Sequence, residues 1–528
     1  MIMSLMPFER KRTSESFKDG LLGSPLMAVT RLALAWALAA VGTACTHSTP
    51  QPSLPATATA ELQPPATPAG RALGAWLRVY NLGNLDSSRA FAEGAYAAQE
   101  LAQRSAELIA RGNRLWLMNY GEMRLVRIDS ATAYSVEATV HEALPDAFGK
   151  VWVEVDSVSP HRITGVWLSP FEMAPSEHLG SRPADDAALA AALDAYAAEL
   201  AEHDVLSGAV LVARHGRPVF ARAYGTADRE PLTPNTLETR FELASLSKLF
   251  TAVAVAQLVE RGRLTFDMSV ATVLPDYPNP EVGRRITIHH LLTHTSGLPD
   301  FYRNGKIRQF EDSIRTLRDY WRTFAMDSLW SEPGARYDYS NSNYIMLGSI
   351  VERASGLEFE DYVRRNVFEP SGMANTCYCE PGAPRYATPR SRYTTGFGPQ
   401  RRAVIERWVE VPTGAKRPGA PAGGGISTAG DLTRFAQALL EHRLLGQRMT
   451  DLIVAPQVTM EDGGRRGYGF EVYDFFDTRV VGHGGNFWGT MSQIDIYPAS
   501  GYTVVVLSNN DASGGPAIRN WTRRILAR

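Results

Sequence analysis

Residues 241–248 have the sequence FELASLSK, and an apolar run, LFTAVAVAQLV, follows at residues 249–259. The run predicts a buried helix that begins near Ser245 and carries Lys248 one turn further along the same face. Ser245 then lies near the positive end of the helix dipole, where its backbone N–H can bind an oxyanion. A serine hydroxyl becomes a strong nucleophile when a base takes its proton, and burial lowers the pKa of a lysine enough for that task. The alternative is a capping serine beside a surface lysine, because S-x-x-K is common by chance.

A second motif, Tyr339-Ser340-Asn341, lies about 90 residues downstream. A tyrosine hydroxyl close to a lysine can pass protons to a leaving group. An asparagine two residues further on can hold a substrate amide, or the lysine itself, by hydrogen bonds. The alternative is a polar loop that caps the following helix, and Ser342 fits that role.

A third motif, His483-Gly484-Gly485-Asn486, lies between two apolar strand segments. Paired glycines allow a substrate to lie against the backbone of a strand. The N–H of Asn486 would supply a second oxyanion donor, and His483 would donate to a substrate carboxylate or join the proton relay. The alternative is a glycine-rich turn with an incidental histidine.

Together, the three motifs in this order resemble the superfamily of class C β-lactamases, D,D-peptidases and carboxylesterases. The resemblance covers about residues 185–528 and extends to GRLTFD at 262–267, ITIHHLLTHTSGL at 286–298 and GGGIST at 423–428. It implies a mixed α+β fold of the β-lactamase-like α/β sandwich type, in which helices flank an antiparallel sheet.

The resemblance also implies a role for each motif. Ser245 would be acylated, and Lys248 and Tyr339 would manage protons. The N–H groups of Ser245 and Asn486 would form the oxyanion hole, and Asn341 would position the substrate or Lys248. The β-lactamases of this family carry Lys-Thr-Gly where this chain has His483-Gly484-Gly485, and histidine with two glycines is more similar to the peptidases and esterases.

Strand patterns near both ends of residues 185–528 predict one sheet that the two ends of the chain build together, with an inserted helical lobe between them. A cleft between the sheet and this lobe is a suitable place for an active site. The expected elements are helices at 187–200 and 517–526, a hairpin of 207–214 and 218–224 around His215-Gly216, and strands at 479–482, 491–497 and 502–507.

Residues 71–180 predict a small α+β accessory domain that resembles the nuclear-transport-factor type in topology. No catalytic motif is recognised in it. The pattern predicts helices at 73–77 and 88–109, followed by strands at 114–118, 123–128, 133–141, 151–157 and 162–168.

The N-terminal 44 residues indicate a signal peptide, because Arg31 precedes an apolar run at residues 32–44 that is too short to span a bilayer. The translation start would be Met1 or Met27. Either Gly42-Thr43-Ala44 directs ordinary cleavage, or Cys45 is lipidated as in a bacterial lipoprotein. Residues 45–70 are rich in Pro, Ala and Thr and predict a disordered linker. The expected location is the periplasm, with membrane attachment if Cys45 carries lipid.

The bulk composition excludes several other classes of protein. The 528 residues are 44% hydrophobic and 21% charged, with a formal net charge of -2, so no nucleic-acid partner is expected. Three cysteines exclude a disulfide scaffold; Cys377 and Cys379 are interpreted as loop residues, free or oxidised to each other. His290 and His294 lack the glutamate of zinc peptidases, so they are interpreted as packing residues, and neither a metal nor a cofactor is predicted.

The sequence therefore predicts an exported serine hydrolase that acts on a small-molecule or peptide substrate, of the carboxylesterase or D-amino-acid-peptidase type. Two other interpretations stay open. One is a true β-lactamase, against which the missing lysine at position 483 argues. The other is a non-catalytic protein that binds cell-wall peptides or penicillin, which would have no need of Ser245, Lys248 and Tyr339 together.

Overall fold

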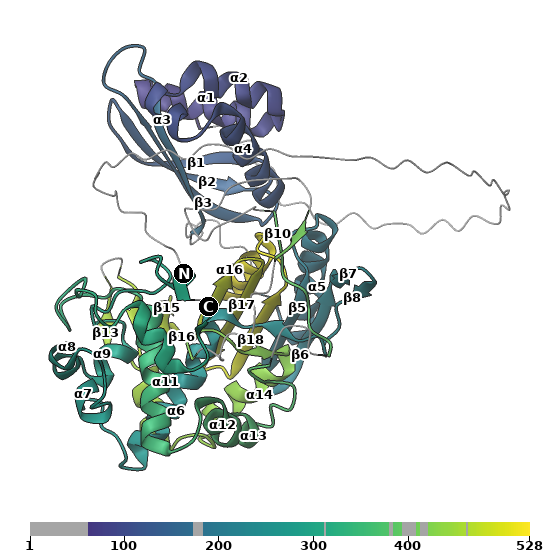
Figure 1. The fold of residues 1–528 in the computed structure, drawn as a ribbon. Helices are drawn as coiled ribbons and strands as arrows, with labels where there is room; N and C mark the ends of the chain where they lie inside the picture. The colour runs from purple at the N-terminus through teal and green to yellow at the C-terminus, as the bar shows by residue number, and fades with distance from the viewer. Residues whose placement is uncertain are drawn as a thin grey trace, which may run out of the picture. The chain divides into compact units, whose positions relative to one another are not determined.

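The computed structural model describes residues 62–172, 183–310, 313–379, 384–392, 408–411, 421–460 and 463–527 (Figure 1). Leu62–Arg528 is one compact unit. The predicted signal peptide, Cys45 and most of the predicted linker lie outside the described residues, as does part of the predicted boundary at residues 180–185. Among the described helices, none combines the length and apolarity needed to cross a bilayer.

Residues 68–172 form four helices followed by a four-stranded antiparallel sheet in the order β1-β2-β3-β4. The sheet and helices enclose a core of their own, in which Trp76 and Tyr80 of the first helix pack against Val140 and Val151. The elements are α1 (Pro68–Leu82), α2 (Leu85–Ala95), α3 (Ala98–Gln103), α4 (Ala106–Tyr120), β1 (Met123–Ala131), β2 (Ser135–Glu142), β3 (Ala147–Val155) and β4 (Ile163–Glu172).

The predicted strand at residues 114–118 is wrong, because these residues belong to α4. A short apolar run fits either a strand or a buried helix face, and here the upstream cap decides. The side chain of Ser105 accepts a hydrogen bond from the N–H of Leu108, which starts a helix that continues to Tyr120. The single helix expected at 88–109 is also divided, because the backbone leaves it at Tyr96 to pair with Ile163 of β4.

An eight-stranded antiparallel sheet forms the centre of residues 183–527, in the order β13-β14-β15-β16-β17-β18-β5-β6. β18 from the end of the chain pairs directly with β5 (Figure 1). The two ends of the chain therefore build one sheet, as the sequence predicted. The β5–β6 turn has positive φ at both His215 and Gly216, as tight hairpins require. The strands are β5 (Gly208–Arg214), β6 (Arg217–Tyr224), β13 (Val458–Thr459), β14 (Arg465–Arg466), β15 (Glu471–Phe475), β16 (Thr478–Phe487), β17 (Thr490–Tyr497) and β18 (Tyr502–Ser508).

Helices cover both faces of this sheet. Along β18, Val504 and Val506 pack with α5 (Asp186–Glu202) and α16 (Gly514–Leu526). Val505 and Leu507 point the other way, into the core that includes α6 (Lys248–Glu260) and α14 (Ala429–Leu440). Successive strand residues face opposite sides, so β18 needs apolar residues at nearly every position. This arrangement confirms the predicted sandwich of an antiparallel sheet and flanking helices.

Between the outer strands the chain forms the predicted, mainly helical lobe. Its elements are β7 (Thr226–Arg229), β8 (Leu232–Pro234), β9 (Phe241–Glu242), η2 (Ala244–Ser247), α7 (Val270–Val273), α8 (Pro280–Arg285), α9 (Ile288–Leu292), α10 (Ile307–Phe310), η4 (Leu317–Thr323), α11 (Asn341–Ser355), α12 (Phe359–Val363), η5 (Arg364–Phe368), α13 (Glu369–Ser371), β10 (Arg390–Ser391), β11 (Val409–Glu410), β12 (Ile426–Ser427) and α15 (Gln447–Val454).

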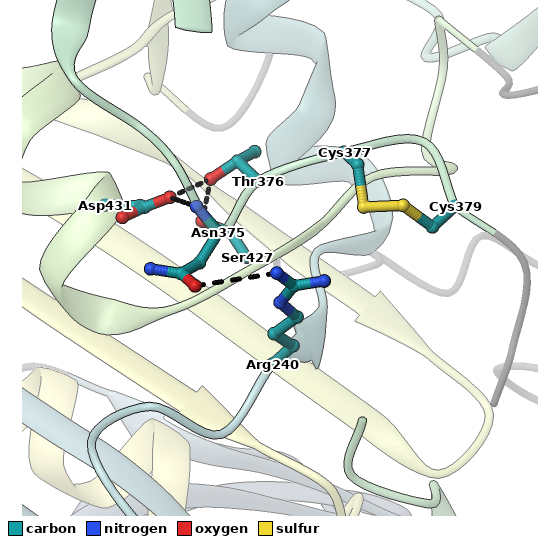
Figure 2. The surroundings of a disulfide bond; sticks show 7 residues. All are labelled: Arg240, Asn375, Thr376, Cys377, Cys379, Ser427 and Asp431. Carbon is teal, nitrogen blue, oxygen red and sulfur yellow. Dashed lines mark hydrogen bonds between the residues drawn. A yellow bond between two sulfur atoms is a disulfide. The ribbon is translucent and has the colours of Figure 1, made fainter. Parts of the chain in front are cut away.

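Cys377 and Cys379 are joined by a disulfide, which settles the alternative that the sequence left open (Figure 2). The backbone of Cys377 exchanges two hydrogen bonds with Ile426 of β12, and β12 pairs in turn with β9. The adjacent Thr376 donates to the carboxylate of Asp431 at 2.7 Å (Figure 2). This segment therefore supports β9, the short strand that leads into η2.

Candidate active site

Ser245 lies on η2, the single 3-10 turn that connects β9 to α6. Ala244, directly before it, has φ of 45°, a left-handed conformation that costs a residue with a Cβ about 1–2 kcal/mol. The strain turns the chain sharply, so that Ser245 is half-buried while Ser247 and Lys248 point into the protein. The sequence thus placed Ser245 correctly at a helix start, and the structure adds the strained turn.

Lys248 is fully buried at the first position of α6. Its Nζ contacts the Oγ of Ser245 at 3.1 Å, the Oδ1 of Asn341 at 2.8 Å and the backbone oxygen of Ala422 at 2.6 Å. Burial lowers the pKa of Lys248 to about 7. A neutral amine has two hydrogens for Asn341 and Ala422, which leaves its lone pair directed at the hydroxyl of Ser245.

Tyr339 donates a hydrogen bond from its hydroxyl to the Oγ of Ser245 at 2.8 Å. Burial raises its pKa well above 10, so the phenol keeps its proton at neutral pH. The ring stacks on His294, with centroids 4.3 Å apart. The Nδ1 of His294 accepts from the N–H of Ser340 at 3.1 Å, which agrees with the prediction that His294 packs and anchors a loop.

Asp300 completes the surroundings of the lysine, although the sequence analysis gave it no role. One of its carboxylate oxygens accepts from both the N–H of Asn341 at 2.7 Å and the side-chain amide of Asn341 at 2.8 Å. The amide nitrogen therefore faces Asp300 and the amide oxygen faces Lys248. The other oxygen accepts from the N–H groups of Tyr302 and Arg303. Asp300 is 2% exposed, which makes it a positioning residue for Asn341 and, through it, for Lys248.

The segment at residues 421–425 packs against the helix start that carries Lys248. The hydroxyl of Thr251 donates to the backbone oxygen of Pro421 at 2.8 Å, and the N–H of Gly425 donates to the hydroxyl of Ser247 at 3.1 Å. A Cβ at Gly423 would lie 3.2 Å from the backbone of Ala244. The glycine run at residues 423–425 was part of the family resemblance. The sequence did not predict that the backbone oxygen of Ala422 accepts a hydrogen bond from Lys248.

The motif at residues 483–486 lies on β16, beside the turn that carries Ser245. A Cβ at Gly485 would come within 2.0 Å of the backbone oxygen of Leu243, so only glycine allows this approach. Gly484 and Asn486 follow the strand register opposite Gln493 and Met491. The strand therefore runs past Ser245, and the oxyanion role of the N–H groups of Ser245 and Asn486 stays a prediction.

His483 is buried, with 2% of its surface exposed. Its Nδ1 lies 2.6 Å from the backbone oxygen of Gly484 and therefore carries the proton. Burial lowers its pKa to about 4, so the ring is neutral at pH 7. The buried pair of Arg466 and Glu471 lies nearby and acts on this pKa in opposite directions. Substrate binding by His483 stays a prediction, and Cys45 lies outside the described residues.

Comparison with known proteins identifies the family of the part of the chain that contains this site. The family model described as Beta-lactamase matches residues 190–528. Penicillin-binding protein 4* of Bacillus subtilis (strain 168) is 29% identical over 329 residues, which are 59% of this chain and 70% of that protein. Esterase EstB of Burkholderia gladioli is 38% identical over 219 residues, 39% of this chain and 55% of the esterase. The crystal structure of a penicillin-binding protein from Bacillus halodurans superposes with a TM-score of 0.53 at 31% identity, over 61% of this chain and 97% of that one.

The position of Asp300 predicts the behaviour of the Asp300→Asn variant. Without its carboxylate the amide of Asn341 is free to rotate, and the loss of a charged hydrogen bond lowers kcat about ten- to a hundredfold. The negative charge of Asp300 raises the pKa of Lys248, so the variant also moves the acidic midpoint of kcat/KM to lower pH. Hydrolysis of a p-nitrophenyl ester across pH 5–9 measures both effects.

The matched control is Asp276→Asn, a surface carboxylate that pairs with Arg353 and should leave both values unchanged. If Asp300→Asn lost activity through a lower melting temperature alone, with the midpoint unmoved, the positioning role would be refuted.

Proposed function

The chain belongs to the beta-lactamase family of serine hydrolases. We propose that it cleaves an ester or amide through an acyl-enzyme on Ser245. We also propose that it is exported. One observation carries the proposal. The Oγ of Ser245 receives contacts from a buried amine, whose pKa is about 7, and from a protonated phenol. A base and an acid on one nucleophile are the requirements of acyl transfer.

In the first half-reaction, neutral Lys248 takes the proton of Ser245 as Oγ attacks the substrate carbonyl carbon. The carbonyl oxygen becomes an oxyanion that the N–H groups of Ser245 and Asn486 stabilise. Tyr339 gives its proton to the leaving alcohol or amine as the bond from carbon to that group breaks. The proton on Lys248 then restores Tyr339, since both side chains meet at the same Oγ.

In the second half-reaction, water attacks the acyl carbon and gives its proton to the phenol–amine pair. The pair passes this proton to the Oγ of Ser245 as the bond from carbon to Oγ breaks, and a carboxylic acid is released. Asn341 and Asp300 hold Lys248 in place through both steps, because the amine must keep one orientation while its charge changes.

The favoured substrates are esters, or amides of the D-amino-acid type, rather than β-lactams. A neutral, buried His483 supplies no fixed positive charge for the carboxylate that a penicillin carries. The likeness to esterase EstB agrees with this choice, although it extends over 55% of that protein. True β-lactamase activity is the second candidate, since the nucleophile and its proton-transfer groups would serve it equally well.

The chemistry is tested by mass spectrometry of the intact protein after exposure to a fluorophosphonate and, separately, to benzylpenicillin. We expect the fluorophosphonate to label Ser245, no label in Ser245→Ala, and labelling slowed by orders of magnitude in Lys248→Ala. Ser313→Ala is the matched control, because this exposed serine only caps a loop, and it should label normally.

Rapid turnover of benzylpenicillin would make the protein a true β-lactamase. The absence of any adduct on a folded protein would instead favour a non-catalytic protein that binds cell-wall peptides.

The pH dependence follows from Lys248. The amine must be neutral to accept a proton, so kcat/KM should rise with pH through a midpoint near 7. It should stay high until the phenol of Tyr339 ionises, which occurs above pH 10 because its pKa is raised. The check is a pH profile with a p-nitrophenyl ester. A midpoint near 4 that disappears in His483→Gln would assign the titration to His483 instead.

Export and lipid attachment are the remaining part of the proposal. The support is the apolar run at residues 32–44 and the small residues before Cys45. If Cys45 is lipidated, the mature protein gains the mass of acyl chains at that residue and sediments with membranes, whereas Cys45→Ala does neither. A native chain that is soluble, with an unmodified Cys45, would leave ordinary signal cleavage as the correct reading.

A further inference from the structure

A cavity whose lining includes none of Ser245, Lys248 and Tyr339 lies at the β5–β6 end of the eight-stranded sheet. Its volume is about 340 Å³, at the lower end of the roughly 300–1,000 Å³ range of small-molecule sites. Its lining comes in part from the end of α5 and from β7, β8 and β10. The strand register connects Asn486 to Met491, Ser508 and Gly208 in turn, so the side of the cavity at Ser207 is about three strand spacings, or roughly 14 Å, from β16. On the other side, the N–H of Arg390 donates to the backbone oxygen of Gly489 in the β16–β17 turn.

A buried guanidinium lines this cavity. Arg390 is 3% exposed and donates to the hydroxyl of Thr226 at 2.9 Å and to that of Ser207 at 3.2 Å. Its Nε has no hydrogen-bond partner in the part of the chain that the structure describes. A buried charged donor without an acceptor is energetically costly. Arg390, Thr226 and Ser207 all line the cavity.

A second buried arginine adds to this excess of donors. Arg392 is 4% exposed, and its Nε and Nη1 also lack partners among the described residues. Its guanidinium stacks on the ring of Trp408, another lining residue, at 4.3 Å.

Two of the carboxylates that act on Arg390, Asp204 and Asp228, already accept hydrogen bonds. Asp204 accepts from Arg392 at 3.1 Å and from the Nε1 of Trp408 at 2.7 Å. Asp228 accepts from the backbone N–H groups of Arg229 and Glu230. Among the described residues, Arg390 forms no ion pair of its own, so its guanidinium can attract an oxyanion.

Part of the remaining lining is apolar, beside the polar Arg229 and Asn510. Leu206 and the ring of Trp408 are buried, and Leu232 is 74% exposed at the rim. A bare inorganic anion would leave these surfaces uncovered, whereas a carboxylate with a hydrocarbon body would cover them.

We propose that this cavity binds a small amphipathic carboxylate, with the carboxylate at Arg390 and the apolar body against Leu206, Leu232 and Trp408. The site is independent of the chemistry at Ser245. Three features define it: a cavity, buried donors without partners among the described residues, and an apolar wall. The residues that form these features come from separate parts of the chain.

Isothermal titration calorimetry of the Ser245→Ala protein tests the proposal with 4-phenylbutyrate, with its neutral analogue 4-phenylbutanol and with inorganic phosphate. We expect saturable binding of 4-phenylbutyrate, and binding at least about tenfold weaker, or about 1.4 kcal/mol, for the other two probes. Arg390→Met should weaken 4-phenylbutyrate to a similar extent.

Because Arg390→Met also removes contacts to Ser207 and Thr226, a second variant keeps the test decisive. Leu232→Asp places a negative charge at the exposed rim and should weaken 4-phenylbutyrate without loss of fold. Leu82→Asp is its matched control, since Leu82 is 68% exposed on α1 and outside the cavity lining. Wild-type affinity in both Arg390→Met and Leu232→Asp, equal binding of 4-phenylbutanol or phosphate, or no binding at all would overturn the proposal.

A last arm separates this cavity from the acylation site. Wild-type protein that has been labelled with the fluorophosphonate should bind 4-phenylbutyrate with unchanged affinity. Loss of binding after labelling would place the carboxylate at Ser245 and refute a second site. If the reagent failed to label the protein, the proposed chemistry would fail while binding by Ser245→Ala would still support the cavity.

Discussion

A lysine amine with no exposure to water is the constraint around which the rest of the site is arranged. Burial disfavours the charged form of Lys248 and brings its pKa to about 7. The neutral amine then needs an acceptor for each of its two hydrogens and a donor for its lone pair. The protein supplies an amide oxygen, a backbone oxygen and the hydroxyl of Ser245. Each of these three groups is itself held by other residues. The hydrogen bonds that Lys248 requires therefore fix the arrangement of the neighbouring helices and loops.

The second requirement is that backbone segments pack closely around the turn that carries Ser245. This close packing explains where glycine is needed. The turn with Ser245 is enclosed by β16 on one side and by the segment at residues 421–425 on the other. A Cβ at Gly485 or Gly425 would collide with Leu243 or with the side chain of Ser247. The predicted oxyanion hole depends on the same closeness, because it requires the N–H groups of a strand and of a helix start to face one substrate oxygen.

Local patterns predicted the elements that are long and buried on a regular period. The helix after Lys248, the β5–β6 hairpin and the C-terminal strands lie where the sequence placed them. The pattern failed at residues 114–118, where an apolar run of five residues fits a helix as well as a strand. It also gave no role to Asp300 and Ala422, because a carboxylate after a loop and a backbone oxygen in a glycine-rich segment carry no distinctive local signal.

The sequence by itself determined the family, because short motifs with fixed local spacings carry the resemblance. That resemblance in turn implied the mixed sandwich and the candidate nucleophile, base and acid. Only the tertiary structure decided which way the amide of Asn341 faces and that His483 is buried and neutral. It also decided that Arg390, in the lining of a cavity, has a donor without a partner among the described residues. The reason is physical. Burial, pKa and hydrogen-bond orientation are set by groups that lie far apart along the chain, and their distances exist only once the two ends of the chain have formed one sheet.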